Sequence, residues 1–175
     1  QGRMSYSDGT IYNGEFKNGL RNGTGTLRYP DGAEYVGEWV DDKRVGYGAY
    51  TPVDRAWTYS GDWKNDVREG HGKLAYADGN YTYEGGFSND VPHGEGTVTF
   101  GDGRTFQGTY VNGKQLGQGA LEFPGGRRIV GDFVELDGGE SGKIVAAGRI
   151  HIRHFGGLTA NQRTACLFAA IRNPG

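Results

Sequence analysis

The amino-acid sequence predicts an all-β protein built from tandem β-hairpin repeats and followed by a short C-terminal helix. Three observations predict this fold class. An aromatic-x-Gly-x-aromatic unit occurs five times and is followed by a weaker sixth copy, a Gly-x-Gly unit recurs with the same period, and turn-forming Asn, Asp and Gly residues lie between them. Because two independent units share a period of 23 or 24 residues, chance does not explain the pattern. The sequence therefore indicates a repeat array rather than one packed globular core.

The composition agrees with local packing that is repeated many times. Of the 175 residues, 34 are glycine and only 35% are hydrophobic, whereas 11 Tyr, 8 Phe and 3 Trp supply large rings. A formal net charge of −2 gives no basic field for nucleic acid. The single Cys166 excludes an intramolecular disulfide and fits a reducing compartment. No apolar run approaches the ~20 residues of a transmembrane helix, so a cytoplasmic protein is expected.

Each repeat is expected to form two short strands. In the first strand the two aromatic residues and the glycine share one face, because side chains alternate along a strand. The six copies begin at Tyr12, Tyr35, Tyr59, Tyr83, Phe106 and Ile129. The second strand carries Gly-x-Gly, at Gly23/Gly25, Gly46/Gly48, Gly70/Gly72, Gly94/Gly96 and Gly117/Gly119. Pairs such as Asn18-Gly19 are typical of the tight turn within a hairpin, and Asp31-Gly32 of the link to the next repeat.

The glycines of the Gly-x-Gly unit have two candidate roles. They supply turn conformations, or they leave room for rings from a neighbouring hairpin. We favour the second role, because Gly25 shares a face with Leu27 and Tyr29. On this interpretation a Gly25→Val substitution clashes with an aromatic ring. The third link, Thr51 to Ala56, lacks the glycine, so a longer or differently shaped loop is expected there.

The pattern resembles the MORN (membrane occupation and recognition nexus) repeat family. Residues 6–133 carry Tyr-x-Gly-x-Trp, a turn, Gly-x-Gly-x-Leu-x-Tyr and Asp-Gly, with variations, over most of the chain. The resemblance implies an elongated, twisted, single-layer antiparallel sheet with a groove lined by the aromatic residues. At about 4.8 Å per strand, twelve strands would span on the order of 60 Å. Each hairpin alone is marginal, so stability is expected to come from stacking on neighbours.

We divide the chain into a repeat array over residues 1–135, a degenerate repeat with strand character over 136–158, and a helix over 159–172. The array of about six repeats opens halfway through a repeat, since Tyr6 aligns with Tyr29 one period later. We therefore expect further repeats before the first residue. A capping-box pattern predicts the start of the helix. This nearly all-apolar helix covers the end of the sheet or, alternatively, packs into a partner.

No catalytic, cofactor or metal site is expected. The Gly-x-Gly units open strands and not the helix that would hold a phosphate, and no nucleophile lies beside a base. The histidines do not converge by periodicity on a metal site; they are His71, His93, His151 and His154. Acidic residues recur inside the first strand, at Glu15, Glu38, Asp62 and Asp132. They are expected to form a solvated row on the outer face beside cations such as Lys17, Lys64 and Arg68.

The aromatic row is the candidate binding site. One ring of each pair is expected to pack on the next repeat, and the more C-terminal ring to stay accessible, since a single-layer sheet has no second layer to bury a whole face. The predicted partner-binding groove consists of Phe16, Trp39, Trp63, Phe87, Tyr110, Tyr35, Tyr59, Tyr83, Tyr50 and Tyr76, with Tyr47 and Phe100 around it. It would take a partner helix or an extended peptide.

These features predict a non-catalytic protein-binding scaffold, and the family resemblance places it in the cytoskeleton, in a cilium or flagellum such as an axoneme. Two alternatives stay open. One is a phospholipid or membrane-surface binding module, which the family name implies but which 19 basic against 21 acidic residues disfavour. The other is the regulatory repeat region of a larger enzyme. Homo-oligomerisation through an exposed sheet edge is a further expectation.

Overall fold

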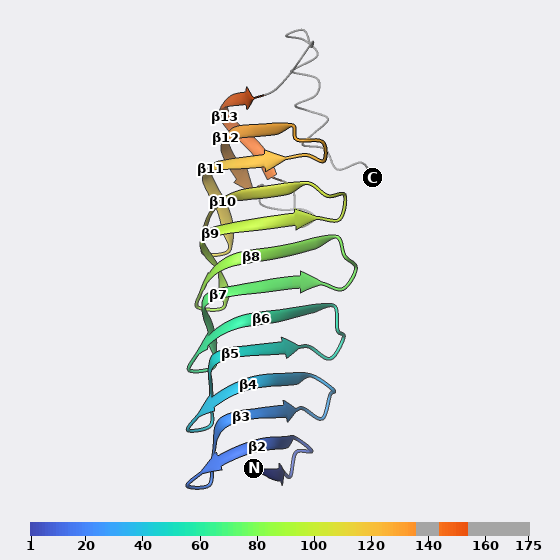
Figure 1. Cartoon of the computed structure of the whole chain (residues 1–175), viewed down its shortest axis with the longest axis vertical. Coiled ribbons are helices and arrows are strands. Elements are labelled where there is room, and N and C mark those ends of the chain that lie inside the picture. The colour runs from blue at the N-terminus through green and yellow to red at the C-terminus, as the bar shows by residue number, and fades with distance from the viewer. Residues whose placement is uncertain (136–143, 154–175) are drawn as a thin grey trace.

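The computed structural model describes residues 1–135 and 144–153 of the chain. Thirteen strands form one antiparallel sheet, and each strand pairs with its neighbours in sequence from β1 to β13. The strands stack one above another along the long axis of the molecule, with their turns at two opposite edges (Figure 1). No helix is present in residues 1–135 and 144–153. The predicted helix over 159–172 lies outside the described residues, whereas the all-β repeat array is confirmed.

The strands are short and regular in length, as the alternating sequence pattern predicts. They are β1 (Gly2–Ser5), β2 (Ile11–Lys17), β3 (Leu20–Arg28), β4 (Glu34–Val40), β5 (Lys43–Thr51), β6 (Trp57–Lys64), β7 (Val67–Tyr76), β8 (Tyr81–Ser88), β9 (Val91–Phe100), β10 (Thr105–Val111), β11 (Lys114–Glu122), β12 (Arg128–Glu135) and β13 (Ile144–Arg153). Tight turns join the two strands of each hairpin, from β2–β3 to β10–β11, and longer linkers join successive hairpins. The tight turns form one edge of the sheet, which we call the turn edge, and the linkers form the linker edge.

A row of glycines crosses the sheet at one register position. Each of the first twelve strands contributes one glycine, and each glycine is paired with the next: Gly2, Gly14, Gly25, Gly37, Gly48, Gly61, Gly72, Gly85, Gly96, Gly108, Gly119 and Gly131. A Cβ added at Gly37 would lie 2.5 Å from the Tyr35 hydroxyl, and one at Gly72 would lie 2.5 Å from a ring carbon of Tyr59. The glycine row therefore exists because aromatic rings lie flat against it.

The two glycines of each Gly-x-Gly unit divide the two roles between them. Gly25, the second, is covered by the Tyr12 ring, so the expected clash of Gly25→Val is confirmed. The ring belongs to the same hairpin, however, and not to the neighbouring one. Gly23, the first, has φ of 80° and lies at a bulge where the β2–β3 register shifts. Turn conformation is thus the role of the first glycine, and space for a ring is the role of the second.

The third linker keeps a turn like that of the second linker but is one residue longer. Eight residues (51–58) separate the paired Tyr50 and Tyr59, against seven (28–34) between the paired Leu27 and Tyr35, so the expectation of a longer loop is confirmed. The Gly32 N–H donates to the Tyr29 carbonyl at 3.0 Å, and the Arg55 N–H donates to the Pro52 carbonyl at the same distance. Arg55 has φ of 52°, so it adopts the left-handed conformation that glycine supplies in other linkers. The local hydrogen bonds hold the turn although the sequence signal is lost.

Candidate binding surface

Aromatic rings form a continuous ladder inside the sheet. Tyr35 contacts Trp39 of its own hairpin and Trp63 of the next, with ring centroids 5.1 and 5.3 Å apart and planes at 86°. The same edge-to-face arrangement links nine rings without a break: Phe16, Tyr12, Trp39, Tyr35, Trp63, Tyr59, Phe87, Tyr83 and Tyr110. We call this set the aromatic ladder. Such pairs contribute about 0.5–1.5 kcal/mol each beyond their burial, so the ladder couples successive repeats.

The ladder is closed to solvent, which contradicts the expectation that the more C-terminal ring of each pair stays accessible. Trp39, Trp63, Phe87 and Tyr110 are only 2%, 6%, 4% and 4% exposed, and Tyr35, Tyr59 and Tyr83 are 0% exposed. Only Phe16 among the ladder residues of the predicted groove is half-buried. The physical reason is that rings lie against the glycine row and against rings of adjacent hairpins, so burial needs no second layer. Their contact with a partner stays a prediction.

Arginine side chains cover the ladder and fasten each hairpin to the next. The Arg21 guanidinium lies 4.3 Å from the centre of the Trp39 ring. Its Nε donates to Asp42 Oδ1 at 2.9 Å, its Nη2 donates to the Asp42 carbonyl, and its backbone N–H donates to the same carboxylate. Arg44 with Asp66 and Arg68 with Asp90 repeat this arrangement. We call each such pair an arginine latch.

The tyrosine hydroxyls of the ladder are anchored to the backbone. Tyr59 donates to the Asp62 carbonyl and Tyr83 to the Gly86 carbonyl, both at 2.9 Å. Burial, with a smaller contribution from the charge of Glu95, raises the pKa of Tyr83 to about 12. Burial also raises the pKa values of Tyr35 and Tyr59. These hydroxyls therefore stay protonated donors at neutral pH.

The acidic row of the first strands has a structural role that the sequence did not reveal. Glu15 accepts hydrogen bonds from the backbone N–H and the hydroxyl of Thr24, and these bonds lower the pKa of Glu15. Glu38 accepts a hydrogen bond from the Tyr47 N–H, and Asp62 accepts one from the His71 N–H. Each carboxylate thus satisfies an N–H at a bulge. Arg68, an expected partner of this row, pairs with Asp90 instead.

A second set of rings, along the linker edge, is accessible to solvent. We call it the aromatic band: Tyr6, Tyr29, Tyr50, Trp57, Tyr76, Tyr81, Phe100 and Phe123. All are half-buried except Tyr76, which is 41% exposed. Within the band, Tyr50 contacts Trp57 at 5.6 Å between centroids, and Tyr76 contacts Tyr81 at 5.4 Å. The band extends over every repeat of the array.

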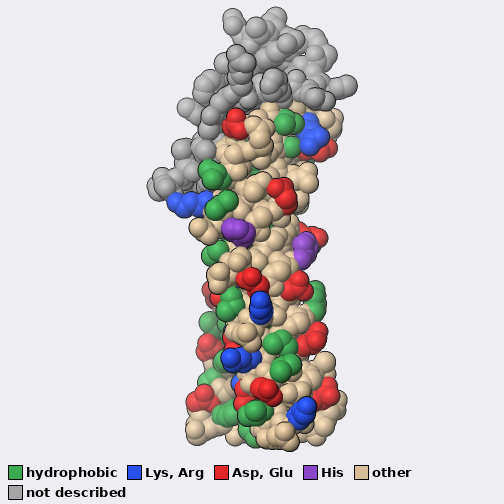
Figure 2. Space-filling model, turned by 90° about the vertical axis from the view of Figure 1, so that its left-hand side faces the viewer, with side chains coloured by type: hydrophobic (Ala, Val, Ile, Leu, Met, Phe, Trp, Pro, Cys, Tyr) green, Lys and Arg blue, Asp and Glu red, His purple; other side chains and the backbone are tan. Residues whose placement is uncertain are grey.

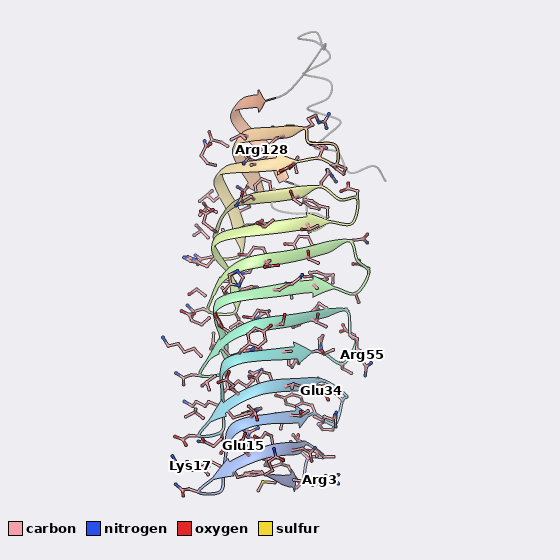
Figure 3. All side chains as sticks on the ribbon, in the orientation of Figure 1. Arg3, Glu15, Lys17, Glu34, Arg55 and Arg128 are labelled. Carbon is pink, nitrogen blue, oxygen red and sulfur yellow. The ribbon has the colours of Figure 1, made fainter. Side chains whose placement is uncertain are left out.

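The aromatic band includes two residues of the predicted groove, Tyr50 and Tyr76, together with the neighbouring Phe100. Its other members were missed. The signal was present, because the last residue of Gly-x-Gly-x-Leu-x-Tyr directly precedes the linker turn in most repeats. Figure 3 shows the two edges of the sheet apart, with Lys17 at the turn edge and Arg55 at the linker edge.

The side of the molecule that carries the turn edge is mixed in charge. Basic, acidic and isolated apolar side chains alternate on it, with no extended surface of one kind (Figure 2). On the outer face of the sheet, a shallow depression of about 770 Å³ near the N-terminal strands is lined by polar residues such as Arg3 and Glu38 and also by Val36 and Tyr47. Tyr47 stands 61% exposed on this face, apart from the aromatic band.

Neither a metal centre nor a membrane-spanning helix is present among the residues that the structure describes. In that part of the chain, no three His, Cys, Asp or Glu side chains come together as metal ligands. The same residues include no helix of the length and apolarity needed to cross a membrane.

One antiparallel sheet of stacked hairpins, with an aromatic ladder inside and an aromatic band outside, defines a β-hairpin repeat protein. The MORN repeat model matches residues 12–34, 35–51, 59–81, 83–103 and 106–126, more than half of the chain. The chain therefore belongs to the MORN repeat family. MORN repeats are in general a non-enzymatic repeat module.

No curated protein matches the chain. Among solved structures, it is similar to the TCP domain of SAS-4 (dCPAP) of Drosophila melanogaster, solved in complex with a proline-rich motif of Ana2 (dSTIL). That similarity has a TM-score of 0.49 and 12% sequence identity, and it covers 87% of this chain and 83% of that chain.

Proposed function

We propose that this chain is a non-catalytic protein-binding scaffold whose partner docks along the aromatic band. The observation that carries the proposal is the recurrence of partly exposed rings at successive linkers along one edge, from Tyr6 in β1's linker to Phe123 after β11. Tyr and Trp residues combine a large apolar surface with a polar group, and for this reason they dominate the energy of many protein interfaces.

The regular spacing of the band favours an elongated partner. Two strands per hairpin give a step of about 9.6 Å between equivalent rings. A helix or an extended peptide running along the sheet axis would meet a new ring at each step. Each ring contact alone contributes little binding energy, and the contributions of successive repeats add up.

We propose further that this scaffold works in the cytoplasm, associated with the cytoskeleton, with a cilium or flagellum as the candidate organelle. The MORN family membership and the regular, non-catalytic architecture support this setting. The mixed charges on the side of the turn edge (Figure 2) do not favour an anionic membrane as the main partner, because such surfaces attract clustered cations.

Affinity purification with band variants tests the proposal. Tyr29→Ser combined with Tyr76→Ser removes two accessible rings and leaves the ladder intact. Tyr47→Ser on the outer face is the matched control, because it removes an even more exposed ring. We expect recovery of bound proteins to fall at least tenfold in the double variant and to stay unchanged in the control. Equal recovery from the double variant, with unchanged circular dichroism, would contradict docking on the band.

Trp39→Ala and Trp63→Ala are unsuitable for this purpose. Both rings are buried in the ladder, and truncating such a ring costs about 3–5 kcal/mol of stability. Loss of binding in those variants would not separate the interface from the fold.

A further inference from the structure

Four linker turns, the first, second, fourth and fifth, hold an aromatic ring and a carboxylate in the same turn. In the first turn, the Gly9 N–H donates to the Tyr6 carbonyl at 3.0 Å, and the Thr10 N–H donates to Asp8 Oδ1 at 2.8 Å. The second and fourth turns repeat the arrangement with Tyr29 and Asp31 and with Tyr76 and Asp78. The ring and the carboxylate are thus the first and third residues of one four-residue turn.

In the fifth turn, an arginine of the chain itself occupies such a unit. Arg104 directly follows the turn, its guanidinium lies 5.2 Å from the centre of the Phe100 ring, and its Nε donates to Asp102 Oδ2 at 2.6 Å. In the sixth turn, the Arg127 guanidinium lies 3.7 Å from the centre of the Phe123 ring. The protein therefore places its own arginine on the ring of these two turns, by cation–π contact and, in the fifth, by an ion pair.

The first four turns lack this internal arginine. The residues at the position of Arg104 are Thr10, Ala33, Ala56 and Asn80. The carboxylates of Asp8, Asp31, Asp54 and Asp78 are exposed, and they form no ion pair within the part of the chain that the structure describes. The hydrogen bond from Thr10 lowers the pKa of Asp8, so this group is ionised at neutral pH. The first, second and fourth turns thus offer a ring and a negative charge without the cation, whereas the third turn has Pro52 in place of the ring and contains Arg55.

We propose that the scaffold recognises a basic, extended segment of its partner that presents Lys or Arg at every third residue, with one cation for each of the first, second and fourth linker turns. This inference rests on the proposed docking along the aromatic band and adds the chemistry of the partner. The spacing supports it. Three residues of polyproline II or extended chain advance about 9.3–9.9 Å, close to the step of about 9.6 Å per hairpin.

Fluorescence anisotropy of synthetic peptides tests the inference on the whole chain. The probe is a labelled peptide of five Arg-Pro-Pro triplets. Its controls are five Glu-Pro-Pro triplets, which reverse the charge, and four Arg-Pro-Pro-Pro quartets, which move the cations out of register. We expect the arginine triplets to bind at least tenfold more tightly than either control and to weaken as salt rises.

Two variants of the chain test whether the peptide binds at the linker turns. Asp8→Asn, Asp31→Asn, Asp54→Asn and Asp78→Asn together remove four charges, while the amide oxygens keep the backbone hydrogen bonds. Asn80→Arg supplies the fourth turn with the internal arginine that the fifth turn has. We expect the fourfold variant to weaken binding about tenfold and Asn80→Arg to weaken it measurably. The matched control removes four charges elsewhere, by Asp41→Asn, Glu84→Gln, Glu95→Gln and Glu122→Gln, and should bind like the parent chain.

The outcomes separate this inference from the proposed function. Equal binding of the glutamate triplets or of the quartets overturns the inference, as does undiminished binding by the fourfold turn variant. In either case the proposed function stands or falls on the recovery of partners by the Tyr29 and Tyr76 variant. If the Tyr29 and Tyr76 variant recovers partners as well as the parent chain does, while the arginine peptide still binds at the turns, the aromatic rings do not contribute to partner binding. The carboxylates of the turns would then be the groups that bind the peptide.

Discussion

The guanidinium of Arg44 lies 4.3 Å from the centre of the Trp63 ring in the following hairpin. The same side chain donates from Nε to Asp66 Oδ1 at 3.0 Å and from Nη2 to the Asp66 carbonyl at 2.9 Å. One residue thus joins two repeats by a ring contact, an ion pair and a backbone contact. Since hairpins of this size are marginal alone, such links determine whether the array unfolds as one unit.

The first prediction concerns this latch. Arg44→Met keeps the aliphatic packing but removes the charge and the donors, so it should lower the free energy of unfolding by about 1–2 kcal/mol. The estimate is modest because the Asp66 side chain is 45% exposed. Lys43→Met, an exposed neighbour, is the control. Urea denaturation checks both, and equal midpoints for the two variants would show that the latch contributes nothing.

The second prediction concerns the place where the latch is missing. Between the fourth and fifth hairpins, Pro92 and Gly113 replace the Arg and Asp, and only the hydrogen bond from the Gly113 N–H to the Pro92 carbonyl is kept. Gly113 has φ of 81°, close to the 68° of Asp90, so an aspartate fits its conformation. Pro92→Arg with Gly113→Asp should stabilise the array by about 1 kcal/mol. Thermal unfolding measures the gain, and each single substitution should give less than the pair.

The third prediction concerns the glycine row. A Cβ on Gly48 would lie 2.5 Å from a ring carbon of Tyr35, so Gly48→Val must displace a fully buried ring. We expect a loss of about 3 kcal/mol by denaturant titration. Ala49→Val, on the exposed outer face of the same strand, should change stability by less than about 0.5 kcal/mol. A well-tolerated Gly48→Val would show that the ring does not need this space.

The fourth prediction concerns alkaline pH. Because burial raises the pKa of Tyr83 from 10.0 to about 12, the unfolded chain loses this proton first as pH rises. The stability that the neutral hydroxyl contributes is therefore complete below pH 10 and is lost between about pH 10 and 12. Tyr83→Phe should cost about 1 kcal/mol at neutral pH, through the lost bond to Gly86, and flatten the alkaline decline. If the unfolding free energy of Tyr83→Phe falls with pH as steeply as that of the parent chain between about pH 10 and 12, the prediction is contradicted.

The sequence was sufficient to predict the hairpin array, because the period of aromatic and glycine positions is a direct record of the strand register. It was not sufficient to tell which rings are exposed. Trp39 and Trp63 were expected at the surface on the argument that a single layer buries little, but the cover comes from Arg21 and Arg44, which are far from them in sequence. The conformation of Arg55 was equally hidden, since hydrogen bonds and not residue type impose it.

The candidate surface was predicted only in part for the same reason. Tyr50 and Tyr76 were identified from their positions within the repeat. Tyr29 and Trp57 belong to the candidate surface because the fold places both at the linker edge of the sheet, which the sequence alone does not show. A period in sequence gives the face of a strand, and burial depends on what the adjacent hairpins place over that face.

The most direct test of the central claim is site-specific photo-crosslinking in cells that express the chain. A benzophenone amino acid is placed at Tyr76 in the aromatic band and, in a separate protein, at Tyr47 on the outer face. Binding along the band predicts a discrete crosslinked protein from position 76, lost when Tyr29→Ser is added, and none from position 47. The same crosslinked protein from position 47 and none from position 76 would contradict the account.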